Sequence, residues 1–137
     1  MKKLFIIPFI LMCVVALPSW GETMDDLVQR DGIYYKKFSD VPFTGEVEGK
    51  SQGRVKNGKR DGPWVNYRDD EQLWSKGDFK NGKKEGFWIY YWENGQLHKK
   101  GEYKNGKKEG RWITYSPFGS PRPGFDGIYR DGVWISE

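Results

Sequence analysis

The sequence predicts an all-β fold: a single elongated, curled antiparallel β-meander of repeated hairpins, preceded by a signal peptide. Three observations support this prediction. The same pattern of residues recurs every 24 positions along the chain. Asn-Gly dipeptides, which favour tight hairpin turns because both residues accept positive φ, stand at fixed places in that pattern. Between the turns come runs of aromatic and β-branched residues, such as residues 87–92, which are typical of strands.

The repeat sets the expected domain organisation. Five kinds of position recur in three copies, each 24 residues apart: Gly53, Gly77 and Gly101; Gly58, Gly82 and Gly106; Gly62, Gly86 and Gly110; Trp64, Trp88 and Trp112; Tyr67, Tyr91 and Tyr115. The units lie near 53–76, 77–100 and 101–126, and a partial unit covers 127–137. The repeat domain therefore covers 45–137, and residues 22–44 form an N-terminal segment that acts as a degenerate cap, as stacked arrays require at their ends.

The strand register follows from the turns. A four-residue loop from Asn81 to Lys84 would place Phe79 opposite Gly86 and Gly77 opposite Trp88. A two-residue loop at Asn94-Gly95 would then place Trp92 opposite Leu97, Tyr91 opposite His98 and Trp88 opposite Gly101. The result is a structural ladder in which large rings cover glycines on neighbouring strands: Gly53, Trp64, Gly77, Trp88, Gly101 and Trp112. Outside the strands, we expect a helix only around Asp25 to Gln29.

The first 21 residues are typical of a secretory signal peptide. Lys2 and Lys3 precede an apolar run from Leu4 to Leu17, and Ser19 and Gly21 place small residues before a cleavage site at Glu22. An uncleaved membrane anchor is the alternative, but the apolar run is short for a bilayer span. We therefore expect export to the periplasm or outside the cell. The one cysteine, Cys13, lies within this segment.

Composition argues against catalysis. Residues 22–137 contain no cysteine and one histidine, His98, so nucleophile–histidine pairs and histidine metal clusters lack their members. The net charge of +4 falls to +2 without Lys2 and Lys3, which does not indicate a nucleic-acid partner. We expect no enzyme, no catalytic residue, no cofactor and no metal. The repeated acids should form cross-strand ion pairs with repeated lysines: Asp61, Glu85 and Glu109 with Lys56, Lys80 and Lys104.

The GxY/FKNGKKEG pattern resembles the MORN (membrane occupation and recognition nexus) repeat over roughly Gly45 to Trp134. Here the second hairpin strand reads Gly-x-Trp where the usual pattern has Gly-x-Gly, and with the NGQL turn the chain is similar to the bacterial MORN-variant form. Members of that form are sometimes labelled antitoxins, a label that fits poorly with an exported chain. The resemblance implies an elongated curled sheet and a scaffolding or binding role, with no defined reaction.

Lysines form the first candidate binding surface. The repeat places them on one rim of the sheet: Lys56, Lys59, Lys80, Lys83, Lys84, Lys104, Lys107 and Lys108. Such a rim would attract anionic lipid or an acidic glycan, or it would merely keep the turns soluble and the edges protected.

The sheet face opposite the tryptophans forms the second candidate. It carries aliphatic and tyrosine stripes bordered by charge, and we name as its candidate residues Tyr67, Ile89, Tyr91, His98, Ile113 and Tyr115. Aromatic anchors among charges are typical of a protein-binding face, but also of the half-wet face of a thin sheet. A single sheet needs a cover on one face, supplied by its own curl, by the segment before Gly45, or by a partner. We expect a protein partner; anionic lipid or glycan binding is the alternative, and carbohydrate stacking on exposed Tyr and Trp is a third.

Overall fold

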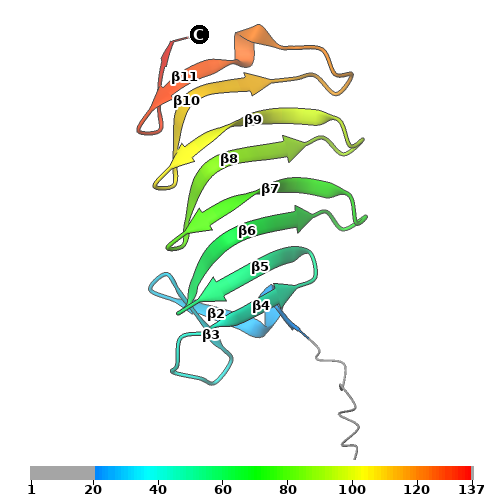
Figure 1. The fold of residues 1–137 in the computed structure, drawn as a ribbon. Helices are drawn as coiled ribbons and strands as arrows, with labels where there is room; N and C mark the ends of the chain where they lie inside the picture. The colour runs from blue at the N-terminus through cyan, green and yellow to red at the C-terminus, as the bar shows by residue number, and fades with distance from the viewer. Residues whose placement is uncertain (1–20, 137) are drawn as a thin grey trace, which may run out of the picture.

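The computed structural model describes residues 21–136 and shows a long, open, curved β-sheet (Figure 1). Ten strands follow one another in the order β1-β4-β5-β6-β7-β8-β9-β10-β11-β12, and β2 and β3 form a separate hairpin. Every neighbouring pair in the long sheet is antiparallel except β1 with β4. The predicted β-meander is therefore confirmed. The strands are β1 (Glu22–Thr23), β2 (Leu27–Arg30), β3 (Ile33–Lys36), β4 (Gly45–Glu48), β5 (Ser51–Lys56), β6 (Lys59–Tyr67), β7 (Leu73–Lys80), β8 (Lys83–Tyr91), β9 (Leu97–Lys104), β10 (Lys107–Thr114), β11 (Gly127–Arg130) and β12 (Val133–Ser136).

The turns that join the repeated hairpins differ from the expected ones. Asn81 and Gly82, with φ of 51° and 79°, form a two-residue turn, so Lys80 pairs with Lys83 and Phe79 pairs with Lys84. The predicted four-residue loop, and with it the pairing of Phe79 with Gly86, is wrong. Between Glu85 and Ile89, β8 then has three residues where β7 has only Gly77, so β8 bulges there, and the ladder resumes with Lys76 opposite Ile89.

The Gly–Trp ladder is confirmed because the bulge restores the register. Gly53 pairs with Trp64, Trp64 with Gly77, and Trp88 with Gly101. Each indole ring lies against a glycine of the preceding strand, and each indole N–H donates to a carbonyl one strand back, at 3.0–3.2 Å. The three rings are 1–2% exposed and form the core together with Val55, Phe79 and Tyr90. We call this side of the sheet the Trp face and the opposite side, which carries Val65, Ile89 and Ile113, the outer face.

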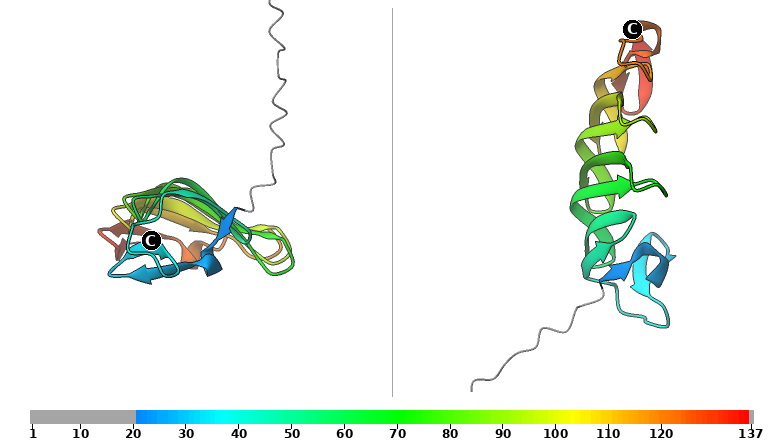
Figure 2. Two further views of the ribbon diagram at one scale, coloured as in Figure 1. Left: turned by 90° about the horizontal axis from the view of Figure 1, so that it is seen from below. Right: turned by 90° about the vertical axis from the view of Figure 1, so that its right-hand side faces the viewer.

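The segment before Gly45 covers one end of the Trp face. Figure 2 shows the sheet arched across its strands, with the β2–β3 hairpin beneath the arch, so the Trp face is the concave one. Leu27 and Phe43 are buried in the common core, and Tyr34 packs against it. The Tyr34 N–H donates to Gly58 O at 2.8 Å, which joins the hairpin to the first Asn-Gly turn. Of the three covers considered for the sheet, this segment is the one seen.

The predicted N-terminal helix is largely wrong. Met24–Asp26 form a single 3₁₀ turn (η1), closed by a capping box between Thr23 and Asp26, and Gln29 lies in β2. A second 3₁₀ turn, η2 (Pro123–Phe125), precedes β11. Among residues 21–136 no helix is long and apolar enough to cross a membrane. The predicted signal peptide lies, apart from Gly21, outside the described residues.

Candidate interaction surfaces

Six of the eight predicted rim lysines lie exposed along one long edge of the sheet, at the stacked Asn-Gly turns. These six, which we call the turn rim, are Lys56, Lys59, Lys80, Lys83, Lys104 and Lys107. Each turn docks on the hairpin before it: the N–H of Gly82 donates to Arg60 O, and that of Gly106 donates to Lys84 O, both at 2.9 Å. This stacking lines up the hairpin turns along one side of the sheet (Figure 1).

The ion pairs expected at these turns do not form. Lys80 pairs with Lys83 across the strands, and Glu85 pairs with Asp78, because the turn is two residues shorter than predicted. Glu85 instead accepts a hydrogen bond from the backbone N–H of Asn105 at 2.8 Å, and Glu109 accepts one from that of Asp131 at 2.9 Å. Glu85 and Glu109 therefore support the following turn, and within residues 21–136 the lysines of the turn rim have no carboxylate partner.

Lys84 and Lys108 do not belong to the rim. Both are strand residues, and both turn onto the Trp face. The Nζ of Lys84 lies 4.4 Å from the ring centre of Trp88 and donates to the hydroxyl of Tyr90 at 2.7 Å. The Nζ of Lys108 lies 4.7 Å from the ring centre of Trp112. Burial, followed by the charges of Lys99 and Arg60, lowers the pKa of Lys84 below its usual 10.5.

The outer face carries a row in which aliphatic residues alternate with lysines. Ile89 lies between Lys76 and Lys100, and Val65 and Ile113 continue the row on either side. Beside this row Phe87 protrudes from the bulge of β8 and is 67% exposed. It borders a shallow apolar depression with Pro63, Val65 and Ile89. Phe87 is not among the candidate residues predicted for this face; its only signal in the sequence was its place in the aromatic run of residues 87–92.

The tyrosine stripe is half-buried and lies at the strand ends. Tyr91 pairs with Leu97, and not with His98 as expected, because β9 carries a bulge at His98. The backbone N–H of Trp92 donates to Gln96 O at 2.8 Å, so the predicted pairing of Trp92 with Leu97 is also wrong. Tyr115 follows the end of β10 and bridges to Pro121. By strand alternation the two isoleucines and three tyrosines stay on the outer side. His98 loses its predicted place opposite Tyr91, although its backbone carbonyl still accepts a hydrogen bond from the N–H of Tyr115 at 2.7 Å.

His98 packs instead against Trp92, with ring centres 3.7 Å apart. The two rings line a pocket at the loop edge of the sheet, opposite the turn rim, together with Arg68, Trp74 and Pro117. Burial is the main cause that lowers the pKa of His98 below its usual 6.5, and the charges of Lys99, Arg122 and Arg68 add to it. Partial burial and these nearby cations therefore disfavour the protonated form of His98.

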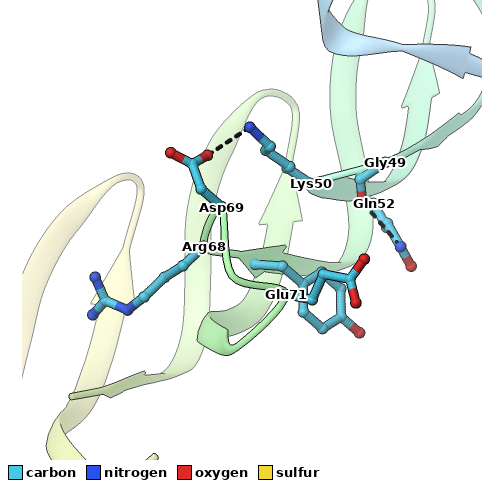
Figure 3. A pocket seen from close by; sticks show the side chains of 7 residues that line it. Gly49, Lys50, Gln52, Arg68, Asp69 and Glu71 are labelled. Atoms are coloured by element: carbon cyan, nitrogen blue, oxygen red, sulfur yellow. Dashed lines mark hydrogen bonds and ion pairs between the residues drawn. The ribbon is translucent and has the colours of Figure 1, made fainter. Parts of the chain in front are cut away.

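A second pocket lies further along the same edge, near the N-terminal end of the sheet (Figure 3). Lys50 and Asp69 form an ion pair across its mouth at 2.5 Å, and the side chain of Gln52 donates to Gly49 O at 3.0 Å. Arg68 points away from these residues in Figure 3. Its Nη2 donates to Tyr91 O at 2.9 Å, which ties this loop to the next repeat.

Catalytic constellations are not evident in the part of the chain that the structure describes. Within residues 21–136 no three His, Cys, Asp or Glu side chains gather in a way that would hold a metal ion.

Comparison with known families identifies one repeat unit. The model of the MORN repeat variant matches residues 84–105, which run from β8 through the Asn94-Gly95 loop to the turn after β9. No curated protein matches the chain. The family match carries no antitoxin assignment. MORN repeats are generally non-enzymatic modules that bind proteins or lipids. Residues 84–105 are thus similar to the variant type of MORN repeat.

Proposed function

We propose that this protein is an exported, non-enzymatic repeat scaffold that binds another protein of the cell envelope or the extracellular space through its outer face. The observation that carries the proposal is Phe87. A phenylalanine that is 67% exposed, beside an apolar depression lined by Val65 and Ile89, gives a partner a ring to bury. Export rests on the signal-peptide pattern of residues 1–21.

The surroundings of Phe87 suit a protein partner better than a lipid one. Acidic side chains share the outer face, where Asp78 pairs with Glu85 and Phe87 itself pairs with Glu102. Lys76 and Lys100 flank Ile89 on the same face. An apolar centre within a border of mixed charge is typical of protein interfaces, whereas paired carboxylates would repel an anionic membrane.

Affinity capture from an envelope extract, with bound proteins identified by mass spectrometry, tests this proposal. We expect one protein to be retained by the wild type at both low and moderate salt. Phe87→Ser and the double variant Tyr91→Ala, Tyr115→Ala should lose it. Phe118→Ser is the matched control, since Phe118 is 91% exposed but lies in the loop after β10. If Phe87→Ser and the double tyrosine variant are folded and capture the protein as well as the wild type does, the outer face is not the binding surface.

The turn rim supports a second candidate function, the binding of anionic lipid or glycan surfaces. Six exposed lysines lie along one edge, and within residues 21–136 none of them forms a salt bridge. Long-range attraction of this kind weakens steeply with salt. Binding to vesicles of anionic phospholipid should therefore fall sharply between low and physiological ionic strength. Vesicle binding that is absent, or indifferent to salt, would eliminate this candidate.

A further inference from the structure

We propose that the Trp face is a second recognition surface, independent of the outer face, and that it binds an extended acidic polypeptide laid across strands β6 to β10. Four cations on this face carry the inference, and we call them the cation row: Arg60, Lys84, Lys99 and Lys108. Arg60, Lys84 and Lys108 occupy equivalent positions of successive repeats, 24 residues apart.

The cation row lies directly on aromatic rings. The Arg60 guanidinium is 4.7 Å from the centre of the Trp64 ring and 5.3 Å from that of Phe79. The Nζ of Lys84 approaches Trp88, Tyr90 and Tyr103 within 4.4–5.2 Å. The Nζ of Lys99 is 4.9 Å from Tyr90, and that of Lys108 is 4.6 Å from Tyr129. Ring faces attract these cations, but they do not neutralise them.

Carboxylates are segregated from this row. Each of β6 to β10 contains one acidic residue, namely Asp61, Asp78, Glu85, Glu102 and Glu109. Each of these is the immediate neighbour of a residue that points to the Trp face, so by alternation it points to the outer face. Within residues 21–136 none of the four cations of the row forms a salt bridge. The charged side chains that these strands direct to the concave surface are therefore all cations.

Two further observations indicate that the row is incomplete without a ligand. Burial lowers the pKa of Lys84, Lys99 and Lys108, and neighbouring cations lower those of Lys84 and Lys99 further. At the N-terminal end, the Nε of Arg60 is buried without a hydrogen-bond partner among the described residues. It borders a small pocket between the β2–β3 hairpin and the sheet. An anion would supply the missing acceptor and relieve the mutual repulsion.

The spacing of the row favours a polypeptide. Neighbouring strands lie about 4.8 Å apart, so equivalent residues of successive hairpins are about 9.6 Å apart. A polyproline II segment advances about 9.3 Å in three residues. An acidic side chain at every third residue would therefore meet Arg60, Lys84 and Lys108 in turn. A flat membrane fits less well, because the sheet is arched with the Trp face on its concave side (Figure 2) and the four cations are partly buried.

Direct binding of a synthetic peptide of repeated Glu-Pro-Pro triplets tests the inference. The row variant combines Arg60→Met, Lys84→Met and Lys108→Met, substitutions that keep a flexible apolar cover over the rings. The matched rim variant combines Lys59→Met, Lys83→Met and Lys107→Met, which removes the same charge one residue away at the exposed turns. We expect the row variant to lose about tenfold or more in affinity, and the rim variant to retain most of it. Gln-Pro-Pro triplets should not bind to any of the three proteins.

A zero-length carbodiimide cross-link on the wild-type protein gives an answer that does not depend on how the variants fold. Glutamates of the bound peptide should couple to the amines of Lys84, Lys99 and Lys108. Coupling mainly to Lys59, Lys83 or Lys107, or equal losses in the two variants, would overturn the inference. So would the absence of peptide binding when anionic vesicles or polyphosphate bind, since the row would then recognise another class of partner. Because the probe is a defined peptide, its result is separate from that of the capture experiment on the outer face.

Discussion

The indole ring of Trp88 lies so close to the backbone of Gly77 that a Cβ atom at position 77 would be 2.3 Å from Cδ2 of the ring. The same relationship joins Gly53 to Trp64 at 2.4 Å and Gly101 to Trp112 at 2.3 Å. Trp88 is 1% exposed and its N–H is bonded to Asp78 O, so the ring has no room to withdraw. The 24-residue period therefore preserves one packing contact in three copies.

Substitution of this glycine should destabilise the whole sheet. We expect Gly77→Ala to lower the free energy of unfolding by about 1–3 kcal/mol, the usual cost of overpacking a core. Urea denaturation followed by tryptophan fluorescence measures it. Gly124→Ala is the control, because no atom lies within 4 Å of a Cβ built there. A loss at position 77 no larger than that at position 124 would contradict the packing described for the ladder.

The bulge glycine should be sensitive for a different reason. Gly86 has φ of +72° and open space where a side chain would lie, so Gly86→Ala adds backbone strain without a clash. We expect a loss of about 1–2 kcal/mol. Gly86→Asn should cost less, since asparagine tolerates the left-handed region better. Equal stability of the alanine variant and the wild type would show that the bulge can form without positive φ.

The bond from Glu85 to the next turn should contribute measurable stability. Glu85→Ala leaves the N–H of Asn105 without its side-chain acceptor, and we expect a loss of about 0.5–1.5 kcal/mol in chemical denaturation. Glu85→Gln keeps an acceptor and should lose less. Asp61→Ala is the positional control, because this shorter side chain in the preceding repeat makes no such bond among the described residues. If Asp61→Ala costs as much as Glu85→Ala, the turn contact is not the cause.

Stability should depend on pH through His98. Burial and the charges of Lys99, Arg122 and Arg68 lower its pKa in the fold, so the unfolded chain takes up a proton first as pH falls below about 6.5. This contribution to stability is complete at pH values above the pKa of His98 in the unfolded chain. It is lost as the pH falls through the lower pKa of His98 in the folded protein. The melting temperature of the wild type should therefore decrease across this window.

His98→Phe keeps a ring against Trp92 but cannot titrate, so its melting temperature should change less over the same range. The carboxylates are common to both proteins and cancel in the comparison. His98 is the one histidine of the chain, so no other imidazole contributes. If the melting temperatures of the two proteins decrease by the same amount from neutral to mildly acidic pH, the pKa of His98 in the folded protein is not lowered.

The turn geometry shows where the sequence pattern was ambiguous. Two geometries use the same number of residues between Gly77 and Trp88. One is a four-residue loop, and the other is a two-residue loop followed by a bulge of two extra residues. Both give the same Gly–Trp ladder, so the 24-residue period cannot distinguish them. They differ in Lys84, which is a loop residue in the first case and a strand residue opposite Phe79 in the second. The cation row was missed for this reason, and two of its lysines were assigned to the rim.

The sequence by itself determined the β-meander, the position of its turns and the glycine that each tryptophan covers, because these follow from local turn preference and from a strict repeat. Only the tertiary structure decided which way Lys84 and Lys108 point and which acids reach the next turn. It also decided that Leu27 and Phe43 cover the N-terminal end of the Trp face. These contacts join segments outside the repeat, or depend on a bulge whose position requires a left-handed Gly86. Such relationships arise from packing in three dimensions, which the 24-residue period by itself does not specify.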